Sequence, residues 1–160
     1  MEKAILQALE DHANLTPAQL AAMCGKETGD VKKLIETYEE NGVILGYKTI
    51  IDWDKTDREY VSALIEVKIT PQRDRGFDEI AGRVCLFPEV QSAWLMSGGF
   101  DLCVLVSGRT MREVALFVAE KLSIMENITA TATHFVLRKY KDNGVVYSQK
   151  TEDERYQGEV

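Results

Sequence analysis

The sequence predicts an α+β protein in which three short helices precede a region of alternating strands and helices. Apolar residues recur at helical spacing over residues 2–40, whereas from residue 61 onward several stretches alternate apolar and polar side chains. A length of 160 residues allows two small domains. We therefore expect a first domain at 1–52 and a second at 61–148, joined by a charged linker at 53–60 and followed by a flexible acidic tail at 149–160.

Composition narrows the class of protein. Hydrophobic residues make up 45% of the chain and charged residues 28%, which is typical of a globular protein. No apolar run approaches the roughly 18 residues of a membrane span, and the N-terminus lacks the pattern of a secretory signal. The three cysteines stand at no zinc or disulfide spacing. These features predict a cytoplasmic protein with no metal, no other cofactor and no membrane partner.

The first domain is delimited by helix start and stop signals. Thr16, Pro17 and Gln19 form a capping box with proline at the first helical position, and Gly25 stops that helix. A third helix is expected from near Thr28 to Glu40, because apolar side chains recur on one of its faces at Val31, Leu34, Ile35 and Tyr38. The pair Asn41-Gly42 ends it.

The residues that follow, Val43 to Ile51, are typical of a strand or one arm of a hairpin. Three helices followed by a strand make a winged helix-turn-helix, the pattern of a DNA-binding domain. Small helical domains of this kind also serve as protein-docking modules. The pattern by itself leaves both interpretations open.

The second domain shows the order β-α-β-β-α-β, which is the ferredoxin-like arrangement. Strands are expected at 61–69, 90–96, 102–106 and 129–139, with helices starting near Phe77 and after Thr110. The first and third strands are the most apolar, as the central strands of such a sheet should be. Because helices cover only one face, we expect a second copy of the chain to cover the other.

Three stretches, taken in this order, resemble the leucine-responsive/asparagine-operon regulator (Lrp/AsnC) family of transcription factors. Residues 39–47, Glu-Glu-Asn-Gly-Val-Ile-Leu-Gly-Tyr, are similar to its junction between recognition helix and wing. Residues 98–102, Gly-Gly-Phe-Asp-Leu, resemble its Gly-x-aromatic-Asp loop, and residues 128–133, Ile-Thr-Ala-Thr-Ala-Thr, its Thr-x-Thr last strand. The likeness covers residues 2–147.

The resemblance implies a RAM-type ferredoxin-like domain, a homodimer that often assembles to an octamer, and a small effector, usually an amino acid. It places the effector site at the loop and two positions of the last strand, which are Ser97, Gly98, Gly99, Phe100, Asp101, Thr131 and Thr133. Glycine N–H groups can approach a carboxylate closely, and Asp101 can accept from an ammonium group. Alternatively, the glycines form only the hairpin and Asp101 caps it.

The DNA-contacting residues are expected near the start of the third helix and on the wing, namely Lys26, Thr28, Gly29, Lys32, Lys33 and Lys48. Residues 1–54 hold five basic and ten acidic side chains, so this domain is strongly acidic for a partner of double-stranded DNA. Members of the family tend to carry arginine on this helix, whereas here it has only lysines, which supply mainly phosphate attraction. Binding by one dimer is therefore expected to be weak and salt-dependent, with assembly of several dimers recovering affinity.

Taken together, the sequence predicts a sequence-specific DNA-binding transcriptional regulator that responds to a small effector, and not an enzyme. Two alternatives remain. The chain can be an effector-binding assembly protein that has lost DNA binding, as the acidic first domain suggests. It can also be an enzyme similar to the haem-pathway decarboxylases that share this architecture. Such an enzyme needs a convergent cationic pocket, and the second domain's Arg73, Arg75, Arg83 and Arg109 are scattered along the chain.

Overall fold

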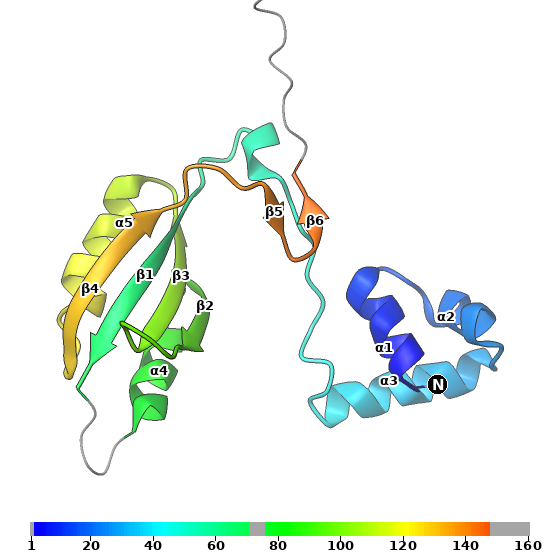
Figure 1. Ribbon diagram of the computed structural model, residues 1–160. Helices are drawn as coiled ribbons and strands as arrows, with labels where there is room; N and C mark the ends of the chain where they lie inside the picture. Colours follow the sequence, from blue (N-terminus) through cyan, green and yellow to red (C-terminus); the bar gives the residue numbers. More distant parts are fainter. Residues whose placement is uncertain (1, 71–75, 148–160) are drawn as a thin grey trace, which may run out of the picture. The chain divides into compact units, whose positions relative to one another are not determined.

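The computed structural model describes residues 2–70 and 76–147 and divides the chain into two compact units, Met1–Ile51 and Asp52–Val160 (Figure 1). Each unit has a hydrophobic core of its own. The acidic tail expected at 149–160 lies outside the described residues, as do Arg73 and Arg75. Within the described ranges, no helix is long and apolar enough to cross a membrane.

The first unit contains the three expected helices, α1 (Glu2–Asp11), α2 (Pro17–Cys24) and α3 (Thr28–Glu40). The predicted capping box is present, because the Thr16 hydroxyl accepts from the N–H of Gln19 and the Gln19 side chain accepts from the N–H of Thr16. At the end of α2, Gly25 adopts the left-handed conformation. The helices enclose a small core, made of Ile5, Leu9, Leu20, Ala21 and Val31.

The strand predicted at 43–51 is wrong. Between residues 42 and 52 the chain forms no strand, although Val43 and Ile44 both donate to the carbonyl of Tyr38 and so hold the start of the segment against α3. A strand exists only where another backbone pairs with it, and no described residue of this unit supplies one. The segment consequently exposes apolar side chains, with Leu45 at 92%.

The second unit contains a four-stranded antiparallel sheet in the order β2-β3-β1-β4. Its strands are β1 (Val61–Ile69), β2 (Val90–Leu95), β3 (Leu102–Gly108) and β4 (Ile128–Phe135). Helix α4 (Phe77–Cys85) connects β1 to β2, and α5 (Met111–Phe117), extended by the π-turn η2 (Val118–Leu122), connects β3 to β4. Strands β1 and β3 are central, which confirms the ferredoxin-like prediction.

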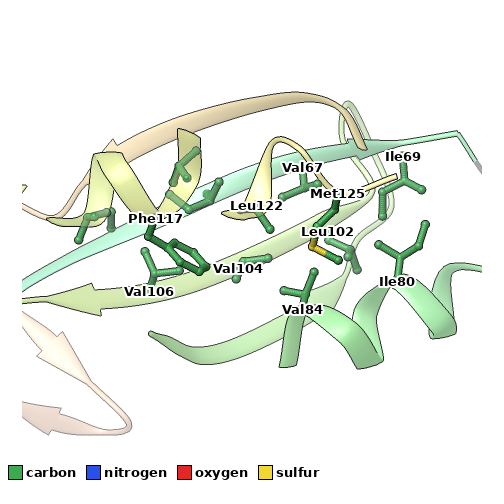
Figure 2. Packing of buried hydrophobic residues seen from close by; sticks show 14 residues of the cluster. Val67, Ile69, Ile80, Val84, Leu102, Val104, Val106, Phe117, Leu122 and Met125 are labelled. Carbon is green, nitrogen blue, oxygen red and sulfur yellow. The ribbon is translucent and has the colours of Figure 1, made fainter. Parts of the chain in front are cut away.

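Both helices pack on the same face of this sheet (Figure 2). Alternate residues of the central strands, among them Val67 and Val104, face Ile80 and Val84 of α4 and Phe117 of α5. Because side chains alternate along a strand, the residues between them face the other side of the sheet. That second face carries no helix among the described residues.

The C-terminal end of the described chain differs from the prediction. Strand β4 ends at Phe135 and not near Lys139, and a small hairpin follows, formed by β5 (Lys141–Asp142) and β6 (Val145–Val146). Its turn residues Asn143 and Gly144 have φ values of 44° and 82°. An Asn-Gly pair with two positive φ angles is the preferred turn of a tight hairpin, so the sequence itself carries the signal for this hairpin.

The linker expected at 53–60 belongs to the second unit, Asp52–Val160. Trp53 starts a short 3-10 helix, η1 (Trp53–Lys55), and the Arg58 guanidinium lies 4.2 Å from the centroid of the Trp53 ring. From the C-terminal segment, the Lys139 ammonium lies 5.5 Å from the Tyr60 ring. Two aromatic rings of this charged segment, Trp53 and Tyr60, therefore stack with cations.

Candidate functional site

The basic residues predicted to contact DNA come from the α2–α3 turn and the first half of α3. Lys26, Thr28, Gly29, Lys32 and Lys33 are all exposed, and they span little more than two helical turns. No side chain caps the first turn of α3, so its free N–H groups add to the positive end of the helix dipole. The structure therefore gathers five of the six predicted residues into one exposed group.

Acidic neighbours weaken this group. The Lys32 ammonium lies 3.7 Å from the Glu36 carboxylate, one helical turn further along, and Asp30 lies in the first turn. Both partners of the Lys32–Glu36 pair are exposed, so water competes with the contact and it is worth little.

Lys48 lies apart from the other five. Its neighbour Tyr47 donates from its hydroxyl to Glu39 at 2.9 Å, which ties this segment to the last turn of α3. Burial, together with the hydrogen bond to Glu39 and the charge of that carboxylate, raises the pKa of Tyr47 above its ordinary value. The basic groups near Thr28 are at the opposite end of the same helix.

The loop between β2 and β3 holds the other predicted site. Asp101 is half-buried there, its Oδ2 accepts from the N–H of Ile69 at 2.7 Å, and its own N–H donates to the carbonyl of Val67 at 2.9 Å. Its carbonyl accepts from the N–H of Met96 at 2.8 Å. Asp101 thus ties the loop to β1, which is the capping role that the sequence left open beside effector binding.

The rest of the loop faces solvent. Ser97, Gly98 and Gly99 are exposed, and Phe100 is half-buried. Gly98 has a φ of 141°, a conformation that side chains rarely allow, so the turn needs a glycine there. Gly99 has no such angle, so only one of the two glycines uses its freedom for the turn. Neither glycine has an atom that would meet an added Cβ within 4 Å, so a ligand can approach both backbones.

Thr131 and Thr133 lie on the face of β4 that the helices cover. Thr131 pairs in register with Val67 on β1, and Val67 pairs in turn with Leu102, the residue after the loop. Thr131 is therefore at the same end of the sheet as the loop, two strands away, or about 10 Å. Its hydroxyl lies 3.1 Å from that of Ser123. Thr133 lies two residues further from the loop, opposite Ile65.

The face of the sheet without helices mixes apolar and charged residues. Leu64 and Leu105 lie on it half-buried, and Trp94 is 49% exposed. At its centre, Nε2 of His134 lies 3.2 Å from Oε1 of Glu66.

The sequence holds two further groups of residues, namely metal-ligand types and the scattered arginines. The described residues contain no group of three or more histidine, cysteine or acidic side chains able to hold a metal ion. Of the two arginines described among the four scattered ones, Arg109 pairs with Glu59 at 3.3 Å on an exposed surface.

Sequence reasoning missed one ion pair beside a cavity. Lys121 donates to Oε1 of Glu89 at 2.6 Å. The pKa of Glu89 is lowered from its ordinary value. Burial, the largest single effect, acts to raise this pKa, but the hydrogen bond from Lys121, a backbone hydrogen bond and the charge of Lys121 together outweigh it. No signal in the sequence links these residues, because they are 32 positions apart.

Both units match models of known protein families. Residues 62–146 match the model of the Lrp/AsnC ligand-binding domain, and residues 1–44 match that of a winged helix-turn-helix DNA-binding domain. The chain belongs to the Lrp/AsnC family of transcriptional regulators. The resemblance of the three sequence motifs is thereby confirmed, as is the α+β class with its two domain types.

Curated relatives of this regulator span nearly its whole length. It is 43% identical over 155 residues to the uncharacterised HTH-type transcriptional regulator YugG of Bacillus subtilis, covering 96% of this chain and 93% of that protein. It is 28% identical over 138 residues to the leucine-responsive regulatory protein of Rhizobium meliloti, covering 86% and 88%.

Solved structures of other regulators share the fold. A transcriptional regulator of Neisseria meningitidis, solved in complex with L-Met, aligns with a TM-score of 0.71 at 22% identity, covering 88% of this chain and 90% of that one. Escherichia coli AsnC aligns with a TM-score of 0.65 at 20% identity, covering 86% and 91%.

Proposed function

We propose that this Lrp/AsnC-type regulator binds double-stranded DNA through the first half of α3, with Lys26, Thr28, Gly29, Lys32 and Lys33 at the interface. The observation that carries this proposal is the exposure of all five, with Lys26 in the α2–α3 turn and the other four on the first turns of α3, the second helix of the helix-turn-helix. In such motifs this helix enters the major groove with its N-terminal residues toward the bases. Lys48, in the segment that follows the C-terminal end of α3, contacts the phosphate backbone outside that groove.

In this proposal, contacts between lysines and the phosphates of the DNA backbone supply most of the affinity. Lysine attracts phosphate as a point charge, whereas arginine makes the bidentate contacts that read guanine, and α3 has no arginine. Each phosphate neutralised lowers the logarithm of the binding constant by about 0.9 per tenfold rise in salt. A single dimer therefore binds weakly at moderate salt. Because chromosomal DNA is the target, we place the protein in the cytoplasm.

Titration of labelled DNA tests the interface. The DNA lies upstream of the protein's own gene, and fluorescence anisotropy is followed at low and at moderate salt. Charge reversal of Lys33 to glutamate is expected to weaken binding and to reduce the salt dependence by about one to two phosphate contacts. Lys3→Glu is the matched control, because Lys3 is exposed on α1 and its substitution changes the net charge of the first unit by the same amount. Equal losses in the two variants would leave only a general charge effect and would contradict this interface.

In the second unit, we propose an amino acid as effector, bound at Ser97, Gly98, Gly99, Phe100 and Asp101 with Thr131 and Thr133 nearby. The exposed loop glycines leave their backbone N–H groups open to a carboxylate. Oδ2 of Asp101 already accepts from Ile69, so Asp101 positions the loop and offers its second oxygen to an ammonium group. The complex of the Neisseria regulator with L-Met supports this class of ligand.

The same proposal includes a homodimer formed through the helix-free face of the sheet. An exposed tryptophan beside half-buried leucines is the composition of an interface core, and the Glu66–His134 pair adds a polar contact within it. Dimers assemble further, to an octamer, and the effector bound between them shifts the balance of assembled forms. The number of DNA-binding heads acting together then changes with effector concentration.

Light scattering with each standard amino acid added singly tests the effector and the assembly together. A change in particle mass with one amino acid, lost in Phe100→Ala, is the expected result, because Phe100 contributes a wall to the site. Trp94→Glu is expected to leave a monomer, since it places a charge in the dimer face. A monomeric unmodified protein would overturn the proposed dimer. A response to an amino acid that Phe100→Ala leaves unaffected would overturn the proposed effector site.

A second candidate function is an effector-binding assembly that no longer binds DNA. The Lys32–Glu36 contact and the ten acidic against five basic side chains of residues 1–54 favour it. It predicts no anisotropy change at either salt concentration while the particle mass still responds to an amino acid. Catalysis has no such support, since the relatives compared above carry the names of regulators.

A further inference from the structure

A cavity of about 260 Å³ lies in the second unit between β3 and the helix that follows it. Apolar side chains form much of its wall, contributed by Val106 on β3 and by Val114, Leu116 and Phe117 on α5. Leu116 is 42% exposed, so the cavity reaches solvent. Pockets for drug-sized ligands begin at roughly 300 Å³, and this one therefore suits a smaller molecule.

Two backbone features shape the cavity. Gly108 lies at its edge, and a Cβ there would be 3.1 Å from Cγ2 of Val114, so a side chain at this position would crowd the wall. Beyond Phe117 the helix widens into the π-turn η2, in which the N–H of Ser123 donates to the carbonyl of Val118 at 2.8 Å. Single π-turns inside helices occur frequently at functional sites.

The polar part of the lining is acidic. It contains the carboxylates of Glu89, Glu113 and Glu120 but only one ammonium group, that of Lys121. Lys121 forms an ion pair with Glu89 at 2.6 Å, and the backbone N–H of Arg109 donates to Oε2 of Glu113. The remaining excess of negative charge attracts a cation and repels a carboxylate.

One carboxylate oxygen at this cavity lacks a partner. Oε2 of Glu89 is buried and accepts no hydrogen bond from the described residues, while Oε1 is held by Lys121. Buried polar atoms are almost always paired, so an unpaired one marks a place where a donor is missing.

We propose that this cavity binds a small organic cation with an apolar body, an aliphatic amine being the simplest example. The apolar wall takes the hydrocarbon part, and the ammonium group lies among Glu89, Glu113 and Glu120. The site is separate from the effector loop, because residues 97–101 precede β3 whereas the cavity lies at the other end of that strand, at 106–108. An amino acid is disfavoured here, since its carboxylate would face the two glutamates that Lys121 does not neutralise.

Binding is tested with three probes of equal chain length, n-hexylammonium, hexan-1-ol and hexanoate. Backbone amide shifts of the ¹⁵N-labelled full-length protein are followed during titration with each. Hexylammonium is expected to saturate in about the millimolar range, as a ligand of few atoms should, and to shift Gly108, Leu116 and Lys121. Hexan-1-ol should bind more weakly and hexanoate not at all. No saturable binding of hexylammonium, or equal binding of hexanoate, would overturn the proposal.

Two pairs of variants locate the site. Leu116→Arg adds a cation to the exposed wall and should abolish binding, whereas Met23→Arg, at a 64% exposed position of the first unit, should not change it. Glu120→Gln should weaken hexylammonium binding about two- to fivefold, the size expected for a partly exposed charge contact. Glu126→Gln removes the same charge from an exposed position outside the lining and serves as its control. Unchanged affinity in Leu116→Arg, or shifts confined to residues 97–101, would contradict this site.

Discussion

The side chain of Asp101 accepts a hydrogen bond at 2.7 Å from the backbone N–H of Ile69, a residue on the neighbouring strand. The register of β1 and β4 shifts between Lys68 and Ile69, so the ladder is interrupted at this residue. Asp101 supplies the acceptor for a backbone group there, and through its N–H and carbonyl it also fixes the loop on which the proposed effector site depends.

Replacing Asp101 with alanine should therefore destabilise the protein even without effector. Ile69 is 7% exposed, so its N–H would lose its acceptor in a place that water hardly reaches, at a cost of about 1–3 kcal/mol. Asp101→Asn keeps an acceptor oxygen and should lose less. Urea unfolding of the two variants measures both values. A change within about 0.5 kcal/mol for Asp101→Ala, the range of ordinary surface substitutions, would show that the bond is not needed.

Removing the carboxylate of Glu36 should strengthen DNA binding. Glu36 competes with phosphate for Lys32, at 3.7 Å on the same helix. An i,i+4 pair of this kind is worth up to about 0.5 kcal/mol, so Glu36→Gln should raise affinity by up to about twofold for each copy of α3 on the DNA. Glu10→Gln is the control, because Glu10 is exposed on α1. Anisotropy titrations compare the two, and an equal gain would mean that only the net charge matters.

The contact between Glu89 and Lys121 should make stability depend on pH. The pKa of Glu89 in the folded protein is below its ordinary value of 4.5, so the contact stabilises the fold above about pH 4.5. That contribution is lost as the pH falls through the lower value in the folded state. Urea unfolding at about pH 7 and about pH 3 should show that Glu89→Gln destabilises at the higher pH and much less at the lower. Glu126→Gln should follow the unmodified protein. A Glu89→Gln penalty that is equal at both values would contradict the role of this charge.

The cysteines should differ in reactivity. Cys85 is exposed, whereas Cys103 is 6% exposed, and burial together with the nearby Glu66 charge raises the pKa of the Cys103 thiol. Because the thiolate is the reactive form, iodoacetamide should alkylate Cys85 well before Cys103. Mass spectrometry of the native protein over time measures both rates. Glu66→Gln should speed the reaction at Cys103, and equal rates at the two sites in the unmodified protein would refute the prediction.

Much of the fold could be predicted because its signals are local. The capping box at Thr16, the stop at Gly25 and the alternation along residues 61–69 each depend on a few consecutive residues, and all appear as expected. The Asn143-Gly144 turn was equally local. The strand predicted at 43–51 does not form, because the segment has strand-forming residues but no second backbone among the described residues to pair with.

The candidate sites show the same contrast between features that local sequence predicts and contacts that depend on the tertiary fold. The exposure of Lys26, Lys32 and Lys33 follows from the apolar face of α3, which fixes what lies opposite. By contrast, neither the tie between Tyr47 and Glu39 nor the packing of Trp53 with Arg58 is encoded in any spacing rule. These contacts depend on where the chain returns after a turn.

By itself, the sequence determined the three helices of the first unit, the order of strands and helices from β1 to β4, the central position of β1 and β3, the family and the group of lysines on α3. Only the tertiary structure decided that Asp101 bonds to Ile69, that Glu89 meets Lys121, and that a cavity remains beside Gly108. Both bonds join residues 32 positions apart. Helix caps and apolar periodicity act over one or two turns of chain, whereas partners at that separation are chosen by strand register and by how helices pack on the sheet.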